Sequence, residues 1–474
     1  MIGSRVWIVV VVACAGAVAA GCGGSGSSIT LVPQSSNQQQ NVMVIDEGID
    51  LSASDLQGKV TATYTETCTD DSGGSGSDAA APPAVSSGPM FDMLKQEFLA
   101  ELAQPDDSCD LKPGISAKPD PLASVAQYKA RWNAMVRAGQ TPDAVFTPAE
   151  ITKLMNPIDT EFSAFNYHGT ATSTTVAHEN PDVRLVLVER QLGSEESLMT
   201  NFPCIQQADI DQLVDLLDDP DVYAAFVKQP AQIDGLLTAA ESKGDVGLVN
   251  ESFGAASRQT LEMLQAANCP DPVTLSAYYQ IIDQATNDHN AMIGGPPVLT
   301  VQAAGNDGVE IDSGADSLSC DLGDPKSLLV GAYNPGTSVQ NMFSDFGKCV
   351  NVFAPGQAII VEYAGGWLTW ASGTSFASPL TVRYTSMATG VPTPFDPTTA
   401  RAAVLAAADP TSTFLPVSLF PSDFFYLPGT TDPEFVVPAA VPRPASKLLP
   451  RLTQAELHRV LGPLNRLRRL KGAR

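Results

Sequence analysis

Short runs of apolar residues recur along the chain, with polar stretches between them. The runs are rich in Val, Ile and Leu, and they cover residues 42–45, 183–188, 246–249, 298–301 and 328–330. Such runs, without strict alternation, are typical of strands buried on both faces of a parallel sheet. Helical patterns lie between some of them, at 209–217 and 258–267. The pattern therefore predicts an open α/β fold, in which a mostly parallel central sheet carries helices on both faces.

The first 22 residues stand apart from this pattern. Arg5 precedes the apolar stretch Val6–Ala20, which is too short to span a membrane comfortably, and Cys22 follows small residues. The arrangement resembles a bacterial lipoprotein signal, in which the cysteine is lipidated and becomes the new N-terminus; a plain secretory signal is the alternative. The resemblance implies an exported protein that is lipid-anchored at the bacterial cell envelope, where the outer membrane is one location. Residues 23–40 would form a flexible tether.

The charge of the chain limits its partners. The 474 residues carry a net charge of −25, although residues 441–474 hold nine Lys or Arg and one acid. The rest of the chain therefore has a charge of −33, which repels polyanions. We expect no nucleic acid partner, and membrane contact only through the lipid anchor.

Cysteine usage agrees with export. Apart from Cys14 and Cys22, the cysteines are Cys68, Cys109, Cys204, Cys269, Cys320 and Cys349. Their spacing does not suit a zinc site, and six cysteines allow fifteen disulfide pairings. Their placement favours one of these pairings, 68–109, 204–269 and 320–349, because each bridge then closes a separate segment.

The segment Gly373–Pro379 offers a serine, Ser375, at the expected start of a helix. Serine is a weak nucleophile unless a nearby base accepts its proton, and that base is usually oriented by a carboxylate. His168 lies in the sequence Tyr-His-Gly-Thr, and Asp46 directly follows the first predicted strand. Taken singly, each of these residues would be an ordinary structural or turn residue. The hypothesis of an activated serine therefore depends on their order along the chain, which is Asp46, His168 and Ser375.

Other segments fit the same order. They are Asn250–Gly254, Ala303–Gly308, Phe343–Gly347 and Val350–Gly356. Together with Asp46, His168 and Ser375, these landmarks resemble the subtilisin-like serine proteases, over residues 41–409. The resemblance implies a subtilisin-like three-layer α/β fold and a serine endopeptidase that cleaves peptides or proteins and needs no cofactor for catalysis.

The resemblance also implies a role for each matching residue. Asp46 would orient His168, which would act as the general base for the nucleophile Ser375. Asn306 would complete the oxyanion hole. Ser252, Phe253 and Gly254 would bind the substrate backbone. No metal site is indicated, and Asp50 and Asp55 are expected to shape a loop; a structural calcium ion is conceivable but not indicated.

The chain departs from the family pattern in residues and in length. Glu47 replaces a small hydroxyl residue, and Ala171 and Leu380 each stand where a histidine is common. Insertions are expected at about 60–165 and 193–245, followed by a Pro-rich segment and basic tail at 410–474. The alternative function is therefore a non-catalytic surface protein of the same fold, which binds a partner through its insertions.

Overall fold

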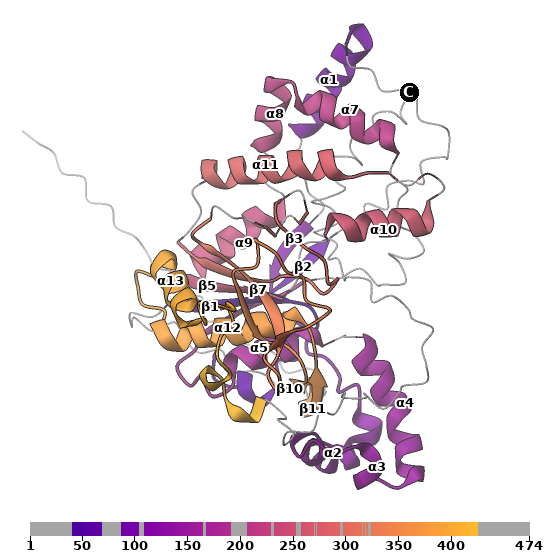
Figure 1. Ribbon diagram of the computed structural model, residues 1–474, viewed down its shortest axis with the longest axis vertical. Helices are drawn as coiled ribbons and strands as arrows, with labels where there is room; N and C mark the ends of the chain where they lie inside the picture. Colours follow the sequence, from indigo (N-terminus) through magenta and orange to yellow (C-terminus); the bar gives the residue numbers. More distant parts are fainter. Residues whose placement is uncertain are drawn as a thin grey trace, which may run out of the picture.

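The protein was analysed as a computed structural model (Figure 1). The structure describes residues 40–424, apart from 69–86, 104–108, 165–166, 191–205, 229–231, 253–256, 270, 272, 294–296, 315, 318 and 321–323. The predicted signal, the tether up to residue 39 and the basic tail lie outside the described residues. No helix in the described part is long and apolar enough to cross a membrane.

A mostly parallel sheet forms the centre of the fold, and its strand order is β3-β2-β4-β1-β5-β6-β7-β8, with β9 paired to β7. Only the β2–β3 and β7–β8 pairs in this sheet are antiparallel. The strands are β1 Asn41–Asp46, β2 Val60–Cys68, β3 Cys109–Pro113, β4 Leu185–Glu189, β5 Val246–Glu251, β6 Leu299–Ala303, β7 Ser327–Asn334, β8 Val339–Gln340 and β9 Val352–Pro355. A separate antiparallel hairpin pairs β10 (Ile359–Tyr363) with β11 (Trp367–Ala371).

The continuous apolar runs become strands because both faces of the sheet are covered. In β1, Val42 and Val44 face one core cluster, whereas Met43 and Ile45 face another. All four side chains are at most 1% exposed. The predicted runs at 42–45, 183–188, 246–249, 298–301 and 328–330 correspond to β1, β4, β5, β6 and β7, so the prediction of a parallel α/β sheet is confirmed.

Helices cover the two faces of this sheet (Figure 1). On one face, α5 (His168–Ala177), α12 (Thr374–Thr389) and α13 (Pro397–Ala407) contribute to the core with Val42 and Val44. On the other face, α9 (Gln232–Lys243) supplies Leu237 and Ala240 to the core with Met43 and Ile45.

The remaining helices form two clusters with hydrophobic cores of their own. One contains α1 (Pro89–Leu102), α7 (Gln207–Leu217), α8 (Pro220–Val227), α10 (Arg258–Asn268) and α11 (Ser276–Ile293). The other packs α2 (Lys129–Arg137), α3 (Pro142–Val145) and α4 (Pro148–Ala164) against the β10–β11 hairpin. Short 3₁₀ turns are η1 Ser54–Leu56, η2 Ala123–Tyr128, η3 Ala364–Gly366, η4 Val417–Leu419 and η5 Ser422–Phe424. The two clusters lie toward opposite ends of the molecule in Figure 1.

The first predicted insertion is therefore divided between these clusters, and it also supplies part of the sheet. Its α1 packs with α7 and α8, and Lys95 of α1 forms an ion pair with Asp219 at 2.6 Å. Its opening residues form β2, which pairs in parallel with β4. Beyond residue 409 the chain still packs on the core, since Phe414 stacks on Tyr333. The predicted domain boundaries remain predictions.

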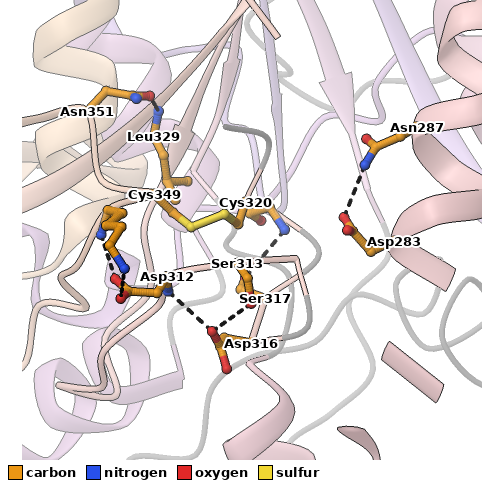
Figure 2. Close-up of a disulfide and its surroundings, with 12 residues drawn as sticks. Asp283, Asn287, Asp312, Ser313, Asp316, Ser317, Cys320, Leu329, Cys349 and Asn351 are labelled. Atoms are coloured by element: carbon orange, nitrogen blue, oxygen red, sulfur yellow. Dashed lines mark hydrogen bonds and ion pairs between the residues drawn. A yellow bond between two sulfur atoms is a disulfide. The ribbon is translucent and has the colours of Figure 1, made fainter. Parts of the chain in front are cut away.

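A disulfide joins Cys320 to Cys349, as predicted, with 5.2 Å between the Cα atoms (Figure 2). It connects the segment that follows β6 to the segment before β9. The β2–β3 register sets Cys68 opposite Cys109, which places the two backbones as the predicted bridge requires. Cys269 is also disulfide-bonded, whereas Cys204 and Cys22 lie outside the described residues. The 68–109 and 204–269 bridges therefore remain predictions.

Candidate active site

Asp46 is the last residue of β1, the strand that lies between β4 and β5. Side chains that follow the carboxyl end of a strand in an open α/β sheet meet in the crevice outside the sheet. The carboxylate of Asp46 is fully buried, and it accepts the Glu47 N–H at 2.7 Å through Oδ1. Because the Asp46 carboxylate is buried and still accepts hydrogen bonds, it is held in one orientation.

His168 begins α5, a helix whose residues are all buried. Its Nδ1 lies 2.8 Å from Oδ1 of Asp46 and 3.0 Å from Oδ2. A carboxylate only accepts hydrogen bonds, so Nδ1 carries the proton and Nε2 is the basic nitrogen of the neutral ring. The structure thus brings together two predicted residues that are 122 positions apart in the chain.

Ser375 is the second residue of α12 and is partly exposed. Helices α5 and α12 pack against each other, and the ring of Phe376 lies 5.4 Å from the imidazole of His168, measured between centroids. The residue that follows Ser375 therefore contacts the predicted base. The N–H of Ser375 is among the first N–H groups of α12, which have no acceptor within the helix and form its partially positive end.

Asn306 lies beside the start of α12. Its Oδ1 accepts the backbone N–H of Thr374 at 2.8 Å and lies 3.0 Å from the Thr374 hydroxyl oxygen. Because Oδ1 is anchored in this way, the orientation of the amide is set and the donor Nδ2 points away from Thr374. Among the described residues nothing accepts from Nδ2, and the Asn306 side chain is exposed. Asp46 thus contacts His168, and His168 contacts Phe376 in the first turn of α12. Thr374 in the same turn contacts Asn306.

Ser252 follows β5 and is buried beneath this site. Its Oγ accepts from Nδ2 of Asn250 at 2.9 Å, and Oδ1 of Asn250 accepts from the hydroxyl of Ser378 at 3.0 Å. Ser378 also lies 3.1 Å from the carbonyl oxygen of Val301. This network ties the end of β5 and the middle of β6 to Ser378, the fifth residue of α12. Phe253 and Gly254, the other predicted substrate-binding residues, lie outside the described residues.

Asp345 supports the loop that carries Asn306. Its Oδ1 accepts the N–H groups of Asp307 and Val309, each at 3.0 Å, while its own N–H donates to the carbonyl of Gly305 at 3.1 Å. Burial raises the pKa of the Asp345 carboxyl to about 7, although the backbone hydrogen bonds act in the opposite direction. Asp345 lies within a segment that the sequence singled out, but without a role of its own.

The acidic residues near β1 hold loops, as expected. Asp50 accepts the N–H of Ser52 at 2.9 Å and that of Gly365 at 2.9 Å. Asp55 lies 2.8 Å from Nδ1 of His178, whose Nε2 lies 2.9 Å from Asp423. Potential metal ligands of His178, Glu179 and Asp423 lie within 4.8 Å of one another. Since both nitrogens of His178 already contact carboxylates, we assign no metal to this group.

Sequence reasoning missed Thr172, whose hydroxyl donates to Oδ2 of Asp46 at 2.7 Å. Thr172 lies four residues after His168, so both side chains occupy one face of α5. This spacing is the signal that the sequence offered. A hydroxyl one helical turn after His168 faces the Asp46 carboxylate as His168 does, once α5 packs against the end of β1.

Comparison with known proteins identifies the family of the chain. The model of the Subtilase family matches residues 37–423. The chain is 38% identical over 84 residues to Alkaline protease 1 of Aspergillus clavatus, covering 17% of this chain and 19% of that protein. It is 59% identical over 39 residues to the putative subtilisin-like proteinase 1 of Encephalitozoon cuniculi, covering 8% of each. The chain thus spans about a fifth of the length of the first relatives it matches.

One solved structure with similarity is a cold adapted subtilisin-like serine proteinase. The identity is 19%, the match covers 52% of this chain and 74% of the other, and the TM-score is 0.30. A score this low adds nothing to the assignment, which depends instead on the family match over most of the described residues. The chain belongs to the subtilase family.

Proposed function

We propose that the protein is a serine endopeptidase in which Asp46, His168 and Ser375 form the catalytic triad. The observation that carries this proposal is the buried bond from Nδ1 of His168 to the carboxylate of Asp46, at the end of α5 that contacts Phe376, the residue after Ser375. This bond selects the tautomer whose Nε2 can accept a proton. Family membership supports the same activity.

In the first half of the reaction, Oγ of Ser375 forms a bond to the carbonyl carbon of the scissile peptide. Its proton passes to Nε2 of His168, and Asp46 stabilises the resulting imidazolium. The carbonyl oxygen becomes negatively charged and is stabilised by Nδ2 of Asn306 and the N–H of Ser375. The carbon–nitrogen bond then breaks, and the proton on His168 leaves with the amine.

In the second half, water attacks the acyl-enzyme. His168 accepts a proton from the water and returns it to Oγ of Ser375, which leaves the carboxyl product free. The substrate is a peptide or protein in extended form, whose backbone would hydrogen-bond to the segment 252–254 as an added strand.

The decisive experiment is labelling of the purified protein with a fluorophosphonate, beside Ser375→Ala. Such a probe reacts with an activated serine, so we expect labelling of the wild type and none of the variant. No labelling of a folded wild-type sample would contradict the protease assignment. It would favour the alternative, a surface protein that binds a partner, for which the two helical clusters offer surfaces outside the central sheet.

We also propose that the protein is exported and lipid-anchored through Cys22. The support is the sequence of residues 1–22 and the disulfide between Cys320 and Cys349, a bond typical of exported proteins. Growth with a labelled fatty acid should label the wild-type protein and leave Cys22→Ser unlabelled. If both proteins partition into the aqueous phase without label, the lipid anchor is wrong and a secretory signal remains.

A further inference from the structure

The hydroxyl of Thr172 donates its hydrogen bond to the carboxylate of Asp46. The distance between Thr172 Oγ1 and Asp46 Oδ2 is 2.7 Å, and both residues are 0% exposed. The same hydroxyl lies 3.3 Å from the carbonyl oxygen of Gly169. A hydroxyl donates one hydrogen, and the charged acceptor at the shorter distance takes it.

Neighbouring hydroxyls of α5 behave differently. Ser173, Thr174 and Thr175 donate to carbonyl oxygens three or four residues earlier in the same helix. Those bonds satisfy buried hydroxyls locally and connect α5 to no other element. Thr172 instead joins α5 to the end of β1, on the face of the helix that also carries His168.

The donors to Asp46 divide its two oxygens between them. Glu47 donates its N–H to Oδ1 at 2.7 Å, and Thr172 donates to Oδ2 at the same distance. Nδ1 of His168 lies between the oxygens, 2.8 and 3.0 Å away. The torsion that rotates a carboxylate is intrinsically soft, so its plane is set by such donors.

We infer that Thr172 is a positioning residue for the Asp46–His168 pair, holding Oδ2 so that the carboxylate keeps its alignment with Nδ1 of the imidazole. Without the hydroxyl, Oδ2 retains only the shared His168 contact among the described residues, and a buried carboxylate oxygen is costly to leave undersatisfied. Rotation toward other donors then misaligns the bond to His168. The consequence for peptide hydrolysis rests on the proposed function, whereas the contact itself does not.

The test compares Thr172→Val with Thr172→Ser. Valine keeps the shape of threonine and removes the hydroxyl, so we expect kcat to fall by about tenfold to a hundredfold, the effect of one charge-assisted hydrogen bond. KM should stay unchanged, because Thr172 lies behind the triad and contacts no substrate. Serine restores the donor and should recover most of the lost rate.

Thr175→Val is the matched control. Thr175 is equally buried in α5, but its hydroxyl donates to the carbonyl of Ala171 at 2.7 Å. This control loses a hydroxyl of the same kind without touching Asp46, and it should retain the wild-type kcat. A fall as large as that of Thr172→Val would mean that the effect is structural, which would overturn the inference.

A spectroscopic measurement tests the inference independently of peptide hydrolysis. The hydrogen on Nδ1 of His168 is buried against a carboxylate, and its proton NMR resonance reports on that bond. The resonance should move or broaden in Thr172→Val and remain in Thr172→Ser and Thr175→Val. An unchanged resonance in folded Thr172→Val would refute the inference. A changed resonance in a protein that no fluorophosphonate labels would support it, and would contradict only the proposed function.

Discussion

The backbone N–H of Gly169 donates to the carbonyl oxygen of Glu47 at 2.5 Å. The residue that follows the predicted base is thereby joined to the residue that follows Asp46. A Cβ on Gly169 would collide with this carbonyl and with the side chain of Ile49. The first turn of α5 can therefore approach the end of β1 because position 169 has no side chain.

Gly169→Ala should accordingly separate α5 from β1. We expect a loss of about 1–3 kcal/mol in the free energy of unfolding, from overpacking, and a disproportionate loss of kcat because the Asp46–His168 bond lengthens. Urea denaturation and steady-state kinetics measure the two effects. Gly336→Ala is the control, since Gly336 lies in an exposed turn, where a Cβ would lie 3.3 Å from the side-chain oxygen of Asn334 and meet no backbone atom. Wild-type kinetics in Gly169→Ala would show that the close approach is unimportant.

Asn306 allows the donor and the anchor of one amide to be separated. Asn306→Asp keeps the oxygen that accepts from Thr374 and removes Nδ2, whereas Asn306→Ala removes both. If Nδ2 stabilises the oxyanion, both variants should lose about 10²–10³-fold in kcat with little change in KM. Only Asn306→Ala should also lower the melting temperature. Full activity in folded Asn306→Asp would exclude Nδ2 from the oxyanion hole.

The sequence predicted the features that arise from local pattern or from a fixed order of motifs. The apolar runs identified β1 and β5 because burial on both faces removes the polar positions from a strand. The same reasoning places Asp46 at the end of the first run, whereas the motif Gly373–Pro379 places Ser375 at the start of α12. The Cys320–Cys349 bridge followed from its placement, because it closes a short segment of its own.

Contacts between distant segments left no comparable signal. Lys95 and Asp219 are 124 positions apart, and nothing near either residue indicates that α1 packs on α8. The roles of Thr172 and Asp345 depend on where α5 and the Asn306 loop are docked, so polar residue type alone could not distinguish them from their neighbours. The sequence therefore predicted the proposed catalytic residues and their order, but not the residues that hold the catalytic side chains in place.

The Cys320–Cys349 disulfide closes a segment that includes β7 and β8 (Figure 2). Removing it in Cys320→Ser/Cys349→Ser should lower the free energy of unfolding by about 2–4 kcal/mol, because the unfolded chain regains freedom. The urea midpoint of the variant, compared with that of the oxidised wild type, measures the loss. Reduction of the wild type should lower the midpoint at least as much, because it also opens the disulfide of Cys269. An unchanged midpoint in the double variant would mean that the bridge adds no stability.

Asp345 gives the stability of the protein a pH dependence with a defined sign. Burial raises the pKa of its carboxyl to about 7, above the ordinary value of 3.8. Between these values the folded protein binds a proton that the unfolded chain has released, so this contribution is complete in acid and is lost as the pH rises through about 7.

Asp345→Asn keeps an acceptor for Asp307 and Val309 but cannot titrate. The free energy of unfolding of the wild type minus that of the variant should therefore decrease from pH 5 to pH 7.5, by up to ~1.4 kcal/mol per pH unit. Denaturation at several pH values measures this difference, and Asp409→Asn, at an exposed carboxyl whose pKa is lowered instead, should show no decrease over this range. A difference that rises with pH would mean that the ionised carboxylate is the form that the fold stabilises.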